Sequence, residues 1–143
     1  MKVTMLLADS AQAVNGKLYI LGGGWSIIGP DPAATAIAIK IDVPWDLANR
    51  SHTFRLALLD ADEQPVVVPT PIGGHALELT GQFEAGRPAG LKPGTDLDVV
   101  LAINVGAFPI KADSRYLWRF FINNETKPDW QVIFTTRPSK PAR

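Results

Sequence analysis

The side chains best suited to chemistry in this chain are two histidines and a short acidic run. His52 and His75 are the only histidines among 143 residues, and there is no cysteine. A zinc site would need both histidines plus carboxylates, but the two do not have the spacing of metal ligands. The presence of only two histidines in the sequence also weighs against a serine–histidine–carboxylate triad. No serine has a nucleophile-elbow context. We interpret both histidines as loop residues and expect no catalytic residue and no cofactor.

The acidic run that begins at Asp60 is the sharpest candidate for metal binding. Sandwich loops often hold calcium, which takes about six to eight oxygen ligands. Asp60, Asp62 and Glu63 supply only part of that shell, and Asp96 and Asp98 add oxygens only if their loop lies alongside. Nothing in the pattern selects a pair of carboxylates for sugar hydrolysis. We interpret the run as a solvated hairpin turn and keep it as a weak calcium candidate.

Trp25 and Trp45 lie near predicted loops. There an indole ring either stacks on a sugar or base, or serves as a buried anchor. With the acidic run, they define an alternative function, a small ligand-binding module for carbohydrate or calcium. Gly22-Gly23-Gly24 suggests a phosphate loop, but it lacks the Gly-Lys-Ser/Thr ending and opens no helix. We interpret these glycines as a bulge or bend in a strand.

Strands must position these residues, and the most regular strand is predicted over Ser114–Ile122. Alternate residues point to opposite faces of a sheet. One set is aromatic or β-branched and is predicted to face the core: Tyr116, Trp118, Phe120 and Ile122. The intervening set faces the other way: Arg115, Leu117, Arg119 and Phe121. We therefore expect a central core strand with an arginine-flanked apolar strip on its outer face.

This strip is the candidate interface, joined on the next strand by Ile133. Arginine and aromatic side chains are enriched at interface centres, and exposed apolar patches often mark partner sites. Two alternatives remain open: the strip is exposed, or a loop such as Gly86–Gly94 covers it. The predicted interface residues are Arg115, Leu117, Arg119, Phe121 and Ile133.

Short strands recur along the rest of the chain, separated by turns rich in glycine and proline. They are predicted at Val3–Ala8, Leu18–Leu21, Thr35–Val43, Thr53–Leu59, Val66–Val68, Leu77–Phe83, Leu97–Val105 and Trp130–Thr136. Asn15-Gly16 predicts a tight hairpin turn, and Ile72–His75 is predicted to be a loop. About eight or nine short strands without helical periodicity predict an all-β, mainly antiparallel two-sheet β-sandwich. We expect one domain over residues 1–137 and a flexible C-terminal tail over residues 138–143.

Composition narrows the classes of partner. The net charge is zero, with 14 acidic and 14 basic residues, so generic binding to nucleic-acid backbones is disfavoured. No run approaches the roughly 20 apolar residues of a membrane span. The apolar run Val3–Ala8 ends at Asp9 and is shorter than the core of a signal peptide. We therefore expect a cytoplasmic protein without nucleic-acid or membrane partners.

Several segments resemble an uncharacterised family of small bacterial proteins, a domain of unknown function. They are Leu6–Asp9 with Asn15–Gly22, Leu58–Asp62, Gly86–Pro88 with Pro93–Thr95, and Tyr116–Ile122. The resemblance covers most of the chain and rests on turn and core patterns. It implies a sandwich-like fold and no catalytic residues. We predict a non-enzymatic protein that acts through contacts with a protein partner or with its own copies.

Overall fold

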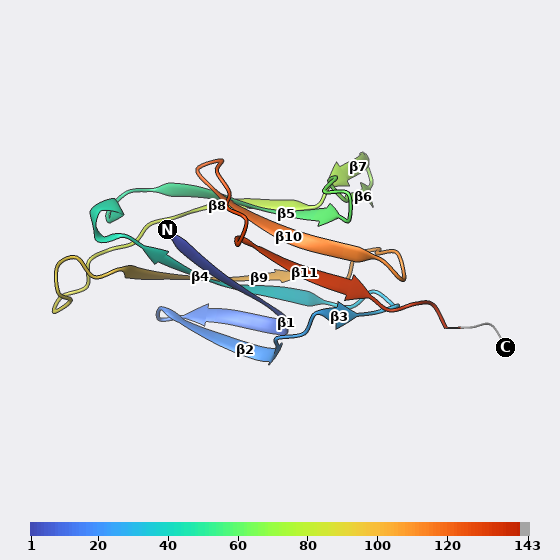
Figure 1. Cartoon of the computed structure of the whole chain (residues 1–143), viewed down its shortest axis with the longest axis horizontal. Coiled ribbons are helices and arrows are strands. Elements are labelled where there is room, and N and C mark those ends of the chain that lie inside the picture. The colour runs from blue at the N-terminus through green and yellow to red at the C-terminus, as the bar shows by residue number, and fades with distance from the viewer. Residues whose placement is uncertain (141–143) are drawn as a thin grey trace.

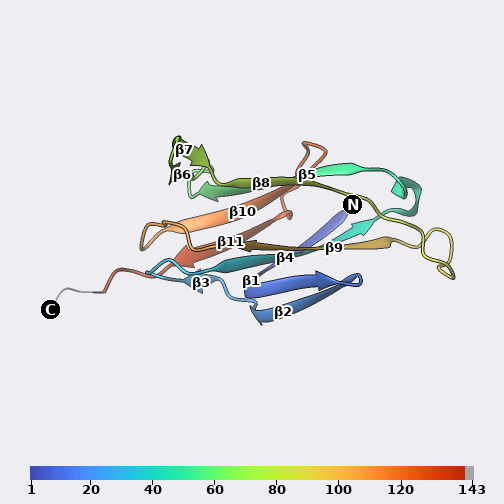
Figure 2. The ribbon, with the colours of Figure 1, turned by 180° about the vertical axis from the view of Figure 1, so that it is seen from behind.

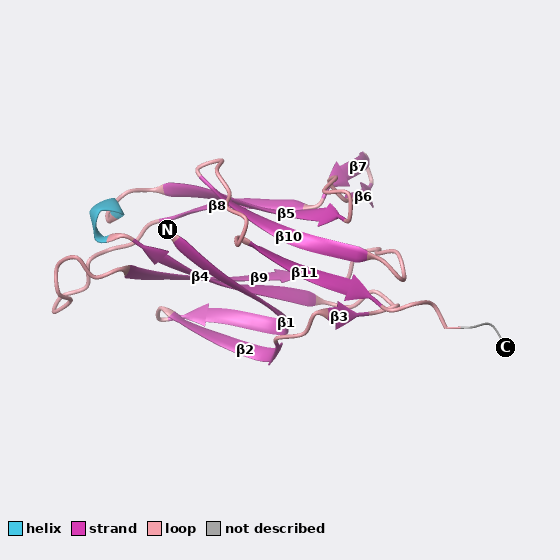
Figure 3. Cartoon of the chain, in the orientation of Figure 1, coloured by secondary structure: helices cyan, strands magenta, loops and turns pink. Residues whose placement is uncertain are grey.

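Strands make up most of the computed structural model, which describes residues 1–140 (Figures 1 and 3). Within these residues there are eleven strands and one 3-10 helix, η1 (Trp45–Leu47). The strands are β1 (Lys2–Val14), β2 (Lys17–Gly23), β3 (Ile27–Ile28), β4 (Thr35–Val43), β5 (His52–Asp60), β6 (Val67–Thr70), β7 (Gly73–Ala76), β8 (Glu78–Phe83), β9 (Leu97–Val105), β10 (Arg115–Ile122) and β11 (Gln131–Thr136).

Two sheets form the sandwich. The four-stranded sheet has the order β2-β1-β4-β9, and the five-stranded sheet has the order β3-β11-β10-β5-β8. Neighbouring strands are antiparallel except β3, which pairs parallel to β11. The β6–β7 hairpin stands at one end of the molecule (Figure 1). The predicted all-β, mainly antiparallel sandwich is confirmed.

The structure has more strands than the eight or nine expected, because very short strands carry little sequence signal. β3 has only two residues. Gly73–Ala76, predicted to be a loop, forms β7 because it pairs with β6 across the Pro71-Ile72 turn. Glycine is a poor strand former, so this strand exists through hairpin pairing rather than through residue preference.

The main core lies between the two sheets and is centred on β10. Tyr116, Trp118, Phe120 and Ile122 are buried there, as predicted. β4 covers them from the other sheet with Ile37, Ile39, Ile41 and Val43. Burial of each large side chain contributes about 2–3 kcal/mol. This shared core places the outward set of β10 on the outer surface of the five-stranded sheet.

β1 is one long strand whose two halves pair with different strands. Lys2–Ala8 pairs with β4, and Ala8–Val14 pairs with β2 across the Asn15-Gly16 turn. Both turn residues have positive φ, 51° and 73°, which fits the predicted tight hairpin. The N-terminal apolar run is therefore part of the core, with Leu7 fully buried.

Gly22 forms a bend in β2, as the triple glycine predicted. Its φ is 61°, and a Cβ there would collide with the carboxylate of Asp9 on β1. On β1, Ala8 and Ala11 pair with Gly23 and Ile20 on either side of this bend. They contribute to the same buried cluster, which shows that the regular alternation of β1 is interrupted. The bend therefore ends the straight part of β2 at Leu21.

Asn104 of β9 anchors the β1–β2 hairpin. Its Nδ2 donates to the carbonyl of Ala11 at 2.8 Å, and its Oδ1 accepts from the Ala11 amide at 3.2 Å. β4 begins at Thr35, which pairs near the end of β9. The side-chain amide of Asn104 thus satisfies main-chain groups of β1 that lie past the end of β4.

The two ends of the described chain differ in structure. Lys2 begins a strand, whereas residues 138–140 form none. Residues 141–143 of the predicted C-terminal tail lie outside the described residues. Among residues 1–140, no helical segment combines the length and apolar character that a transmembrane span requires.

Candidate protein-binding surfaces

The histidines lie in strands rather than in the predicted loops. His52 begins β5 and is buried, with its ring stacked on Phe83 at a centroid distance of 5.3 Å. Asn123 Nδ2 lies 3.1 Å from its Nδ1, and the Leu47 carbonyl lies 3.3 Å from its Nε2. These contacts assign the ring proton to Nε2. His52 therefore ties β5 to two turns, whereas His75 is exposed in β7.

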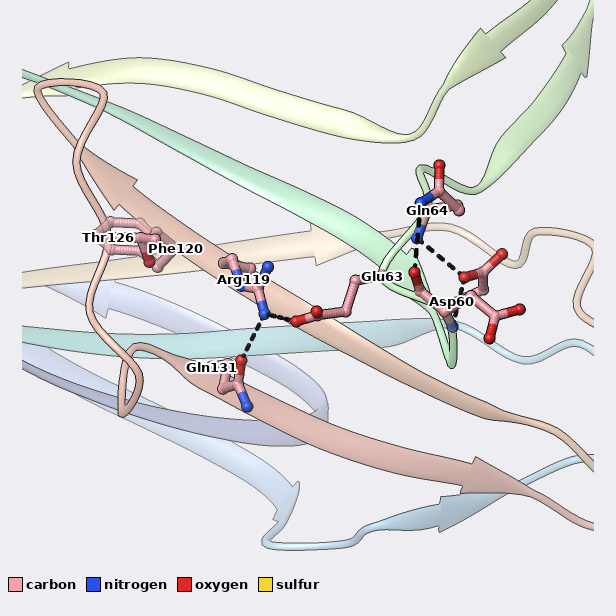
Figure 4. A network of polar contacts seen from close by, with 8 residues as sticks. Asp60, Glu63, Gln64, Arg119, Phe120, Thr126 and Gln131 are labelled. Atoms are coloured by element: carbon pink, nitrogen blue, oxygen red, sulfur yellow. Dashed lines mark hydrogen bonds and ion pairs between the residues drawn. The ribbon is translucent and has the colours of Figure 1, made fainter.

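The acidic run builds a turn (Figure 4). Oδ1 of Asp60 accepts hydrogen bonds from the main-chain amides of Asp62, at 2.9 Å, and Gln64, at 3.0 Å. Glu63 has a positive φ of 58° and forms an ion pair with Arg119. Across residues 1–140, no three His, Cys, Asp or Glu side chains group so that they could hold a metal ion. The carboxylates of Asp60 and Glu63 thus have partners within the chain.

Trp25 and Trp45 are half-buried and pack against the main core. Trp25 meets the ring of Phe134 edge to face, with centroids 6.2 Å apart. The guanidinium of Arg87 lies 4.5 Å from the ring centroid of Trp45 and donates to its carbonyl at 2.9 Å. Arg87 therefore occupies the ring face of Trp45 on which a sugar would stack.

In the structure, the predicted interface on the outer face of β10 is partly buried and partly exposed. Leu117 is buried, at 8% exposure, between its cross-strand neighbours Leu59 and Ile133. Ile133 is 44% exposed, and Arg115 is exposed as well. Only the β11 side and one end of the strip are therefore accessible to a partner.

Charged side chains from the same sheet cover the remaining part of the strip. The guanidinium of Arg55 lies 3.8 Å from the ring centroid of Phe121. Arg119 pairs with Glu63 and also donates to Gln131 Oε1 at 3.1 Å (Figure 4). The Gly86–Gly94 loop, the cover considered from sequence, instead contacts η1 through Arg87.

The β1–β2 hairpin carries a second apolar surface that sequence reasoning missed. On β2, Tyr19 is 56% exposed and Leu21 is 70% exposed. Leu6, Val14 and Ile20 are also exposed. A shallow groove of about 460 Å³ is lined by Ser10, Ala11, Gln12, Tyr19, Ile20, Leu21 and Asn104. We call Lys17–Leu21 the open edge.

The signal for this surface was present in the sequence. Leu18-Tyr19-Ile20-Leu21 is a continuous apolar run, not an alternating one. Such a run indicates a strand buried on both faces. Here β1 is its hydrogen-bonded neighbour, and the β1–β2 hairpin turns back beneath β4 and β9 (Figures 1 and 2), where Leu18 packs against an alanine cluster of β1 and β4. Tyr19, Ile20 and Leu21 are exposed because, among the described strands, β2 pairs with one neighbour instead of two.

The other three sheet edges have features that discourage pairing with another strand. β3 is only two residues long. Glu78 on β8 forms an ion pair with Arg55, and Asp98 on β9 forms one with Lys40. The open edge has no proline, and its one charged side chain is Lys17 at its end.

The fold and these surfaces define an all-β, mainly antiparallel sandwich with one unprotected edge. A family model described as a family of unknown function (DUF6941) matches residues 3–133, and the chain belongs to this family. The predicted resemblance to a domain of unknown function is confirmed. No curated protein and no solved structure matches the chain.

Proposed function

We propose that this chain is a non-enzymatic protein-binding module of the bacterial cytoplasm that adds a strand of a protein partner to the open edge. The observation that carries the proposal is the exposure of Tyr19 and Leu21 on an edge strand whose one charged side chain, Lys17, stands at its end. In strand addition, main-chain hydrogen bonds give affinity and alternate side chains give specificity. The groove beside Tyr19 and Leu21 would receive side chains of the added strand.

This proposal moves the predicted binding surface from β10 to β2. It keeps the expected mode of action, contact with another protein, and changes the residues responsible. We favour it over carbohydrate or calcium binding because Trp45 and Asp60 are engaged within the chain. Partners with an exposed extended segment are the expected class.

A pull-down from native extract tests the proposal. The bait variants are the wild type, the double variant Tyr19→Lys/Leu21→Lys and the control Ile72→Lys. Ile72 is 85% exposed, in the turn between β6 and β7, so its replacement also removes exposed apolar surface. We expect a protein that the wild type and control recover and the double variant loses. Equal recovery by three baits that circular dichroism shows to be folded would contradict the proposal.

A further inference from the structure

The Asn15-Gly16 turn determines which main-chain groups of the open edge are free. Val14 and Lys17 flank this two-residue turn and are register partners. Such a flanking pair exchanges hydrogen bonds, and pairs farther along an antiparallel ladder alternate between bonded and non-bonded. Lys17, Tyr19 and Leu21 therefore direct their amides and carbonyls toward β1. Leu18 and Ile20 direct theirs away from β1, to the side on which no strand of residues 1–140 pairs with β2.

We infer that the strand added to the open edge is the open edge of a second copy of this chain, paired antiparallel about Tyr19. This inference rests on the proposed function and names its partner. Leu18 would then lie opposite Ile20 of the second copy, so that their outward main-chain groups bond to each other. The two β1–β2 hairpins would join as one four-stranded antiparallel sheet.

Side-chain complementarity favours a second copy as the occupant. In this register Tyr19 lies opposite Tyr19 of the second copy, at a non-bonded site where cross-strand side chains are closest. Lys17 lies opposite Leu21 of the second copy, and the two lysines are at opposite ends of the pairing. No like charges face each other across it.

Charge favours the same occupant. The net charge of the chain is zero, so two copies approach without overall repulsion. A strongly acidic or basic partner would gain little from the open edge, because Lys17 is its one charged side chain.

The assembly would close at two copies. Pairing each open edge with itself is an isologous, twofold contact, which uses up both surfaces. The bend at Gly22, with φ of 61°, limits the pairing to the straight part of β2. The opposite edge of the same sheet, β9, has its apolar side chains buried or half-buried and Asp98 ion-paired. A dimer is therefore expected instead of a fibre.

Sedimentation velocity over a range of concentrations tests the inference. For the wild type we expect the mass to rise from 15.5 kDa to twice that value. Ile20→Pro should stay at the single-chain mass, because proline removes an outward amide and leaves the bonds between β1 and β2 intact. The Tyr19→Lys/Leu21→Lys variant keeps every amide of β2 and decides the question if the proline variant does not fold. Ile72→Lys should dimerise like the wild type.

Two outcomes would overturn the inference. One is a wild type that keeps the single-chain mass at every concentration, and the other is a dimer that folded edge variants form equally well. Repeating the native-extract pull-down separates this failure from failure of the proposed function. A monomer that recovers a different protein through Tyr19 and Leu21 refutes self-pairing alone. A monomer that recovers nothing through these residues refutes both.

Discussion

The outer face of β10 and the open edge on β2 both carry apolar side chains, but they differ in what lies beside them. β10 is the middle strand of the five-stranded sheet, whereas β2 ends the four-stranded one. Leu117 has the apolar neighbours Leu59 and Ile133 on its two sides. Leu21 has Ser10 on one side and, among the strands of residues 1–140, no paired strand on the other.

Side-chain chemistry widens this difference. Arg55 and Arg119 cover the apolar cluster on the five-stranded sheet with long side chains, which bury their apolar stems and leave the charged groups at the surface. In the open edge the single long charged side chain, Lys17, is at the start of the strand. Position in the sheet and the nearby charges, rather than residue type, decide which apolar surface stays accessible.

The largest expected effect is the difference in unfolding free energy between two variants that place the same charged side chain on one surface or the other. Leu117→Asp buries an unpaired carboxylate and is expected to cost about 3–5 kcal/mol of unfolding free energy. Leu21→Asp, at a position that is 70% exposed, should change it by less than about 0.5 kcal/mol in a single chain. Urea unfolding at a concentration where the protein is monomeric measures both. Equal losses would show that the two surfaces are buried alike.

The sequence predicted the fold well because alternation reports which residues share a face. The inward set of β10 and the strand over Thr35–Val43 agree with the structure. The Asn15-Gly16 turn was also recognised, because both of its residues tolerate positive φ. Short strands such as β7 were missed, because their pairing comes from tertiary contacts and not from local preference.

The accessible surface was harder to predict, because alternation does not say what lies over a face. The cover on β10 depends on Glu63, whose positive φ is part of the turn beside Arg119. The exposure of Tyr19, Ile20 and Leu21 depends on strand order, which the sequence does not give. A continuous apolar run indicates either a fully buried strand or an unprotected edge, and only the position of β2 in the sheet separates them.

Removing one covering side chain should make the two surfaces more alike. In Arg55→Ala, Phe121 loses the guanidinium that lies over its ring. The expected cost is about 0.5–1 kcal/mol, the range for an exposed cation–π contact. The newly exposed ring should increase binding of a hydrophobic dye relative to the wild type. Arg50→Ala, in the loop before β5, is the control, and a similar dye response in both variants would contradict the covering role of Arg55.

The two halves of the four-stranded sheet differ in their charged side chains, and Lys40 on β4 shows the difference. Its Nζ lies 2.7 Å from Oδ1 of Asp42 and 3.2 Å from Oδ1 of Asp98 on β9. The hydrogen bonds to Asp42 and then Asp98 raise the pKa of Lys40 above its ordinary value of 10.5. The β4–β9 half of this sheet thus holds ion-paired charges, whereas the open edge holds Lys17 alone.

The smallest expected effect is the loss, at alkaline pH, of the stability that the ion pairs of Lys40 add. Because the pKa is higher in the folded chain, the added stability is full below pH 10.5 and disappears as pH rises through the folded value. With 44% of its side chain exposed, Lys40 should contribute less than about 1 kcal/mol. Urea midpoints of the wild type should exceed those of Lys40→Gln at pH 8, and the gap should close above pH 10.5. Lys92→Gln, which removes one positive charge from the loop before β9, controls for net charge. A gap between wild type and Lys40→Gln that stays constant with pH would mean that these carboxylates do not stabilise the charged lysine.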